Sequence, residues 1–199
     1  MKRSLRIAVA DDEPVVQRFF REVLPRMGHE VVAVAGTGRE LVERCHTSNP
    51  NLIITDIKMP EMDGITAACE IYRKHTVPVI LVSAHHDPEL IDRAESDHVM
   101  AYLIKPIKQA DLEVAIQLAS WRFEQFQILQ AEAKNLRQAL QHRKLIERAK
   151  GIIMKRGGLD EDEAFRRLQK LARDKNLRVI DVAEIVLGTE TESSPAGKG

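Results

Sequence analysis

Five polar side chains follow apolar runs of the sequence, at points where β-strands are expected to end. They are Asp11 and Asp12 after residues 5–10, Asp56 after 51–55, Ser83 after 77–82, and Lys105 after 101–104. A helical pattern follows each run, so the strands should lie parallel, and ligand sites form beyond the carboxyl ends of such strands. We therefore expect three carboxylates, one hydroxyl and one ammonium group to meet in one pocket.

This set of groups suits a divalent cation and a phosphoryl group. A carboxylate that accepts a phosphoryl group needs a nearby cation to screen the incoming charge, and Mg²⁺ binds few protein oxygens and retains water. Asp56, alone at the end of a central strand, is the expected acceptor and would form an aspartyl-phosphate. Asp12 would bind the metal directly and Asp11 through water, while Lys105 and Ser83 would contact acceptor and phosphoryl oxygens. Taken singly, each residue also has a plainer explanation, such as a helix cap or a turn.

The composition indicates a globular chain with two differently charged halves. At 199 residues, one large or two small domains are expected. Residues 1–121 carry 14 Lys/Arg and 18 Asp/Glu, whereas residues 122–188 carry 15 and 10, which favours a cation in the first part and a polyanion in the second. A solvated basic helix face is the alternative.

The termini and cysteines favour a cytoplasmic location. The sequence has no apolar run of transmembrane length and no signal peptide, so we expect no contact with a membrane. Cys45 and Cys69 lack the spacing of metal ligands and are expected to be free thiols.

Strand and helix patterns alternate along the first 120 residues. Strands are predicted at about 5–10, 30–35, 51–55, 77–82 and 100–104, and helices at about 13–27, 38–47, 64–74, 88–96 and from 109 onward. Several strands are apolar on both faces, as a sheet covered by helices on both sides requires. The prediction is an α/β fold with a doubly wound, five-stranded parallel sheet of flavodoxin-like type.

The last of these helices continues well beyond a compact domain. Residues 109–156 contain no Pro, and their first Gly is Gly151. Apolar residues recur in heptads at Ala119, Phe126, Ala133 and Leu140, with Leu129 and Leu136 interleaved and Arg122 and Arg143 at the ends. This seam predicts a coiled coil that either forms a homodimer or packs on the chain's own C-terminal helices.

A small three-helix all-α domain is predicted after the coiled coil. Asp160 and Glu163 form a capping-box pattern, and the helix that follows should bury Ala164, Phe165, Leu168 and Leu171. Residues 174–178 form a turn before a short last helix at 179–187. The predicted domains are 1–120, a coiled-coil linker at 121–135, a helical domain at 136–188 and a disordered tail at 189–199.

Residues 5–120 resemble the receiver domain of two-component response regulators. The matching motifs are Asp11-Asp12, Asp56-Ile57-Lys58-Met59-Pro60, Asp63-Gly64, Ser83-Ala84 and Lys105-Pro106. The resemblance implies phosphorylation by a cognate histidine kinase and a metal ligand from the backbone of Lys58. It also implies a switch in which Ser83 moves toward the phosphoryl group and Tyr102 rotates inward. A tyrosine of an edge strand with its hydroxyl in water is the alternative for Tyr102.

Residues 136–187 resemble the ANTAR domain of transcription antiterminators. The matching motifs are the segment from Arg143 to Met154, Glu163-Ala164-Phe165 and residues 182–187. The resemblance implies binding of RNA hairpins in nascent leader transcripts, which prevents a terminator stem and promotes antitermination. The candidate RNA-binding residues are Arg143, Lys144, Arg148, Lys150, Lys155 and Arg156. For each of these alone, a solvated surface role is the alternative.

Three other functions were considered for the sequence. A DNA-binding response regulator would place a recognition helix in the major groove, but the last helix carries Asp181 and Glu184. An antiterminator controlled by a protein partner without phosphorylation would leave the carboxylates of the pocket without a role. An enzyme is not expected, because the receiver would catalyse only its own phosphoryl transfer to Asp56 and its dephosphorylation.

Overall fold

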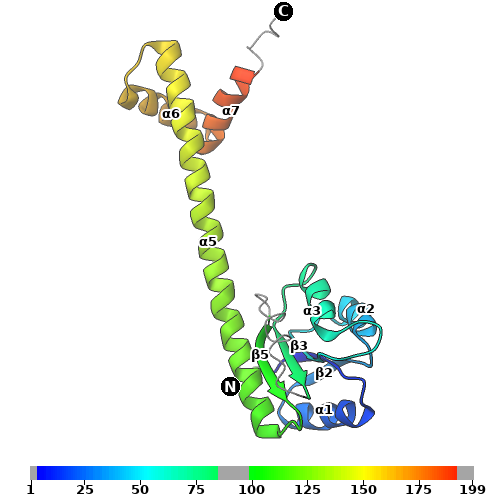
Figure 1. Cartoon of the computed structure of the whole chain (residues 1–199). Coiled ribbons are helices and arrows are strands. Elements are labelled where there is room, and N and C mark those ends of the chain that lie inside the picture. Colours follow the sequence, from blue (N-terminus) through cyan, green and yellow to red (C-terminus); the bar gives the residue numbers. More distant parts are fainter. Residues whose placement is uncertain (1–3, 85–98, 192–199) are drawn as a thin grey trace, which may run out of the picture. The chain divides into compact units, whose positions relative to one another are not determined.

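The computed structural model of the chain describes residues 4–84 and 99–191. The first of its two compact units is built around a five-stranded parallel sheet with the strand order β2-β1-β3-β4-β5 (Figure 1). The strands are β1 Arg6–Ala10, β2 Glu30–Ala35, β3 Leu52–Asp56, β4 Val79–Ser83 and β5 Val99–Ile104. This order and the parallel strands confirm the predicted doubly wound sheet.

Helices cover both faces of the sheet. Helix α1 (Pro14–Arg26) and the beginning of α5 (Gln109–Gly157) pack on one face through residues such as Phe20 and Leu112. Helices α2 (Gly38–Ser48) and α3 (Gly64–Tyr72) pack on the other through Leu41 and Ile71. The two apolar layers explain why the central strands are apolar on both faces.

The strand register brings the ends of the central strands level with one another. Asp56 at the end of β3 pairs with Val82 of β4, and Ser83 pairs with Ile104 of β5. The Lys105 amide donates a hydrogen bond to the Ser83 carbonyl (2.8 Å), so the pairing continues one residue past β5. Side chains that follow these strands therefore begin from one edge of the sheet.

Apart from the last helix, the described elements begin and end within two residues of their predicted limits. The helix predicted at 88–96 lies outside the described residues. Helix α2 begins where the Thr37 hydroxyl accepts a hydrogen bond from the Glu40 amide, and α3 begins where Asp63 accepts one from Thr66. Such side-chain caps satisfy amides that have no partner within the helix.

Helix α5 is 49 residues long and begins in one compact unit, residues 1–127, and ends in a second, residues 128–199. The division falls inside the predicted linker. Residues 127–141 are all exposed, including the predicted seam residues Leu129, Leu136 and Leu140. None of the described helices is long and apolar enough to span a membrane.

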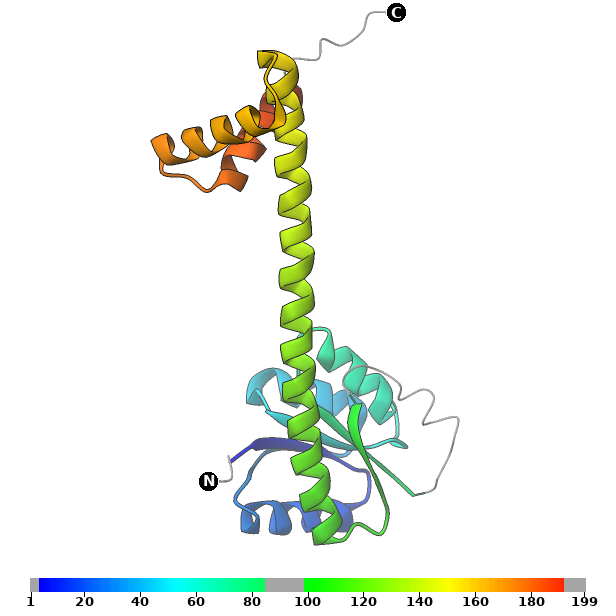
Figure 2. The ribbon, with the colours of Figure 1, turned by 90° about the vertical axis from the view of Figure 1, so that its left-hand side faces the viewer.

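The second unit packs α6 (Glu161–Lys175) and α7 (Val179–Thr191) against the end of α5 (Figure 2). Its core contains Ala149, Leu168 and Ala183. The predicted capping box is present at Asp160, and Asn176 caps the C-terminal end of α6 in the left-handed conformation (φ 53°).

Two predictions for this unit need correction. Phe165 is 37% exposed, because Ala164, Leu168 and Ala172 form the buried stripe of α6 and Phe165 lies beside it. The last helix continues to Thr191 rather than ending at Leu187, so the beginning of the predicted tail is helical. Residues 192–199 lie outside the described part of the chain.

Candidate functional site

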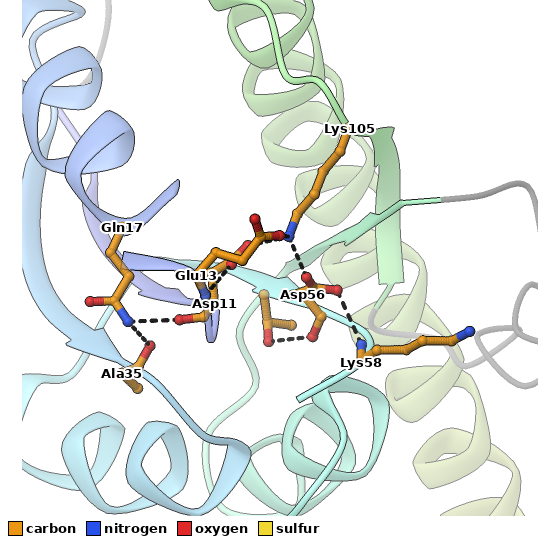
Figure 3. A network of polar contacts seen from close by, with 8 residues as sticks. Asp11, Glu13, Gln17, Ala35, Asp56, Lys58 and Lys105 are labelled. Carbon is orange, nitrogen blue, oxygen red and sulfur yellow. Dashed lines mark hydrogen bonds and ion pairs between the residues drawn. The ribbon is translucent and has the colours of Figure 1, made fainter. Parts of the chain in front are cut away.

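The ends of β1, β3 and β5 bring together the acidic residues and the lysine that the sequence analysis selected. Carboxylate oxygens of Asp11, Asp12 and Asp56 lie within 4.8 Å of one another. The Lys105 ammonium nitrogen lies 2.5 Å from Asp56 Oδ2 and 2.9 Å from Asp11 Oδ2. Figure 3 shows the lysine reaching over the carboxylates from its own strand. The structure therefore places one cation among three carboxylates.

Asp11 is held by hydrogen bonds to its side chain and to its backbone carbonyl. Its Oδ1 accepts a hydrogen bond from the Glu13 amide (2.9 Å), and its carbonyl accepts one from the Gln17 side chain (2.7 Å) (Figure 3). The side chain is 1% exposed, and this burial raises the pKa of the Asp11 carboxyl despite the neighbouring Lys105. The ion pair of Oδ2 with Lys105 lacks hydrogen-bond geometry, so this buried oxygen retains lone pairs for a further ligand.

Asp56 is presented by a tight turn after β3. Its Oδ1 accepts a hydrogen bond from the Lys58 amide (3.1 Å), whereas the Lys58 side chain extends away (Figure 3). Gly64 approaches this turn so closely that a Cβ atom there would overlap the Asp56 carbonyl oxygen. This close approach explains why the Asp63-Gly64 motif has a glycine at position 64. The remaining Oδ2 faces Lys105.

Lys105 is stabilised in its charged form. Burial alone would lower the pKa of its ammonium group, but hydrogen bonds to Asp56 and Glu13 and the ion pair with Asp11 outweigh burial and raise it. The Lys105-Pro106 peptide bond is cis. A permanently charged donor at this place suits an oxyanion.

Glu13 is a member of the cluster that the sequence analysis missed. Its Oε1 lies 2.8 Å from the Lys105 nitrogen, although its side chain is 59% exposed. Glu13 directly follows the two aspartates and precedes α1. Its place in the acidic run was visible in the sequence, but its reach to a lysine 92 residues away was not.

The acidic cluster fits Mg²⁺. Two or three carboxylates at the edge of a sheet, with space for water, are the oxygen ligands that this ion prefers. Asp11 and Asp56 are buried and Asp12 is exposed, so a bound ion would have access to solvent on one side. The Asp56–Lys58 turn also lies beside the cluster, as a backbone ligand from Lys58 requires.

The predicted switch residues lie on neighbouring strands. Ser83 is 4% exposed at the end of β4. Tyr102 of β5 is partly buried and packs on the apolar layer that α2 and α3 cover. Their movement on phosphorylation stays a prediction.

Most of the basic residues chosen on α5 are exposed. They are Arg143, Lys144, Arg148, Lys155 and Arg156. The Arg156 side chain donates a hydrogen bond to the Thr189 hydroxyl (3.5 Å). These five cations remain available for a polyanion, and RNA contact stays a prediction for each.

Lys150 differs from them. Its side chain is 9% exposed, and its nitrogen lies 2.8 Å from Glu147 and 2.7 Å from Glu161. Hydrogen bonds to these two carboxylates raise its pKa, and the same nitrogen lies 5.8 Å from the centre of the Phe165 ring. This environment favours a structural role that ties α5 to the beginning of α6. RNA contact by Lys150 stays a prediction.

Comparison with known families agrees with the two units. A family model described as "Response regulator receiver domain" matches residues 7–117, and one described as "ANTAR domain" matches residues 134–187. The chain belongs to the response regulator family. It joins a receiver domain to an ANTAR domain, as both resemblances predicted.

A relative with a similar length strengthens the assignment. The transcriptional regulatory protein PdtaR of Mycobacterium tuberculosis is 40% identical over 184 residues, which cover 92% of this chain and 90% of that protein. The chemotaxis protein CheY of Bacillus subtilis is 36% identical over 107 residues, which cover 53% of this chain and 88% of that protein.

Solved structures resemble the receiver unit. The signal receiver domain of the response regulator NarL from Mycobacterium tuberculosis has a TM-score of 0.51 at 27% identity, covering 56% of this chain and 96% of that one. A DNA-binding response regulator of the LuxR family from Staphylococcus aureus has a TM-score of 0.54 at 27% identity, covering 57% and 96%. Both matches cover about the length of the receiver.

Proposed function

We propose that the protein is a phosphorylation-dependent response regulator that binds RNA hairpins in nascent transcripts and promotes antitermination. The observation that carries this proposal is a cluster of three carboxylates with Lys105 2.5 Å from Asp56, joined in one chain to a basic ANTAR domain. The relationship to a transcriptional regulatory protein along nearly the whole chain supports it.

The receiver chemistry follows from the positions of the side chains. A cognate histidine kinase would supply the phosphoryl group. The bond from phosphorus to an Asp56 oxygen forms as the bond from phosphorus to the kinase's histidine nitrogen breaks. Lys105, which is already paired with Asp56 Oδ2, then neutralises the charge of a phosphoryl oxygen. The hydrogen bond from the Lys58 amide keeps the carboxylate oriented.

A divalent metal would complete the charge balance. Asp11, Asp12 and Asp56 would hold Mg²⁺, together with the Lys58 carbonyl, and the ion would screen the negative charge of the incoming group. In this proposal, the chain catalyses only its own phosphorylation and dephosphorylation.

Ser83 and Tyr102 would carry the signal from the pocket. Ser83 is the last residue of β4, and Tyr102 is half-buried on the adjacent β5. A phosphoryl group that attracts the hydroxyl would free space for the tyrosine to turn inward. The surface formed by β5 would change as a result.

The exposed seam of α5 supports a homodimer, at least when the protein is phosphorylated. Leu129, Leu136 and Leu140 are 63%, 65% and 52% exposed, at the seven- and four-residue spacings of a heptad seam. A helix segment without tertiary contacts is marginally stable in water, so a second copy that covers these leucines would stabilise it. Two ANTAR domains in one dimer would bind paired hairpins with increased effective concentration.

The ANTAR domain would bind RNA through phosphate contacts. Arg143, Lys144 and Arg148 are exposed on α5. The α7 helix carries Asp181 and Glu184 on its surface, and Arg178 is paired with Asp181, which disfavours α7 as a DNA recognition helix.

A binding comparison tests this function. The full-length protein, loaded with Mg²⁺ and beryllofluoride, is titrated at about 150 mM salt with a leader RNA carrying two hairpins and with duplex DNA of the same length. We expect saturable binding to the RNA and only weak, salt-sensitive binding to the DNA. Equal or tighter binding to DNA would contradict the proposal.

A further inference from the structure

A pocket of about 560 Å³ lies in the ANTAR domain, where the C-terminal end of α6 turns into α7. Its apolar part is formed by Ala172, Leu177 and Val179, and its polar part includes Gln169 and Asn176. Pockets of a few hundred cubic ångströms with an apolar lining and a few polar groups are typical ligand sites. The predicted RNA contacts on α5 do not include any of these residues.

The polar side chains around this pocket are available to a ligand. Among the described residues, the side chains of Gln169, Arg173 and Asn176 have no hydrogen-bond or ion-pair partner. Glutamine and asparagine amides each present donors and an acceptor. This combination can read the edge of a nucleobase.

Arg178 lines the same pocket and is held in place. Its guanidinium donates hydrogen bonds to both carboxylate oxygens of Asp181, at 3.0 and 2.6 Å, and this pairing raises the pKa of Arg178. The pairing orients the plane of the guanidinium, whose side chain is 74% exposed. Unstacked RNA bases stack on aromatic rings or on guanidinium planes, and the pocket lining named here contains no aromatic ring.

A row of positive charge leads to the pocket. Arg166, Lys170 and Arg173 are exposed and stand at i, i+4 and i+7, on one side of α6. None of them is in an ion pair with a described carboxylate. The row extends about 10 Å along the helix, and its last member, Arg173, also lines the pocket. A polyanion bound along α6 would thus carry its attached groups to the pocket.

We propose that this pocket receives one unstacked base from the loop of the bound RNA hairpin. Gln169 and Asn176 read the edge of the base, Arg178 stacks on its face, and the row Arg166–Lys170–Arg173 contacts the phosphates on either side. The inference rests on the proposed RNA binding and adds the element that selects the loop sequence. Loop bases are accessible in RNA because they are outside the helical stack.

A selection experiment tests the pocket. Full-length protein with Mg²⁺ and beryllofluoride selects from hairpins that share one stem and carry a randomised loop. The double variant Gln169→Ala/Asn176→Gly removes both amides, and glycine is chosen at 176 because the backbone there has a φ of 53°. We expect the wild type to select one base at a loop position and the variant to lose that preference, with roughly tenfold weaker binding to the selected hairpin.

Two further variants separate base reading from phosphate contact. Gln141→Ala removes an exposed glutamine from α5 and should leave the selected loop and its affinity unchanged. Lys170→Ala should weaken binding to all loop sequences alike. It should also reduce the slope of the logarithm of the binding constant against the logarithm of the salt concentration by about one. Melting temperatures equal to that of the wild type verify that each variant is folded.

The outcomes distinguish the pocket from the RNA function itself. If the double variant keeps the wild-type loop preference, the pocket proposal is wrong while RNA binding stands. If the folded wild type binds no hairpin above its affinity for duplex DNA, both proposals are wrong.

Discussion

Replacing Lys105 by methionine tests the charge balance of the acceptor pocket. The Lys105 nitrogen contacts Asp11, Glu13 and Asp56 at 2.9, 2.8 and 2.5 Å. The Lys105 side chain is 14% exposed, and those of Asp11 and Asp56 are 1% and 8% exposed. The substitution Lys105→Met therefore leaves two carboxylates close together with little access to water.

The expected loss of stability follows from these exposures. Breaking a fully buried ion pair costs about 3–5 kcal/mol, whereas exposed pairs contribute about 0–1 kcal/mol. Glu13 is 59% exposed and can turn into water. We therefore expect Lys105→Met to lower the free energy of unfolding of the receiver by about 2–3 kcal/mol in EDTA.

The same substitution should strengthen Mg²⁺ binding, because Lys105 occupies carboxylate oxygens and repels a second cation. Two unit charges 4 Å apart interact by about 4 kcal/mol at an effective dielectric constant near 20. A tenfold gain in affinity requires only about 1.4 kcal/mol. We expect Lys105→Met to bind Mg²⁺ at least roughly tenfold more tightly than the wild type.

Hydrogen–deuterium exchange of peptides from β1 and β3 measures the stability, and calorimetric titration measures the Mg²⁺ affinity. Lys108→Met is the matched control, since Lys108 is an exposed lysine three residues away. Unchanged exchange in EDTA together with unchanged Mg²⁺ affinity in Lys105→Met would refute the reasoning.

Three further predictions concern Gly64, Cys45 and Lys150. Gly64→Ala should abolish beryllofluoride binding measured by calorimetry, because the added methyl group displaces the Asp56 turn; normal binding would show that the turn is compliant. Burial raises the pKa of Cys45 from 9.0 to about 12, so the unfolded chain ionises first as pH rises. The stability advantage of wild type over Cys45→Ala should therefore shrink by about 1 kcal/mol between pH 8 and pH 10 in urea titrations, and a constant difference would contradict this. Lys150→Met should lower the melting temperature of the ANTAR domain, whereas the exposed Lys144→Met should not; equal melting temperatures would argue against the structural tie to Glu161.

The sheet and its acidic edge were predictable because they depend on local pattern. Apolar runs end at Asp11, Asp56 and Lys105, and parallel strands necessarily carry their ends to one edge. The length of α5 was also predictable, since no Pro interrupts it. The capping box at Asp160 fixed the beginning of α6.

Contacts between distant residues were not predictable from pattern. The sequence shows an acidic run at Glu13, but the rotamer that brings it to Lys105 depends on the folded sheet. Lys150 lies in a basic segment, yet its carboxylate partner Glu161 comes from the next helix. Phe165 was assigned to the core with Ala164 and Leu168; these two are buried, but the stripe continues through the small Ala172 and leaves Phe165 at its side.

The central claim is that the state of Asp56 controls RNA binding, and one titration tests it most directly. Affinity for a two-hairpin leader RNA is measured at about 150 mM salt for wild type and Asp56→Asn, each with and without Mg²⁺ and beryllofluoride. The account predicts that beryllofluoride strengthens RNA binding by the wild type and has no effect on Asp56→Asn. Tight RNA binding by the wild type that is the same with and without beryllofluoride would contradict phosphorylation control.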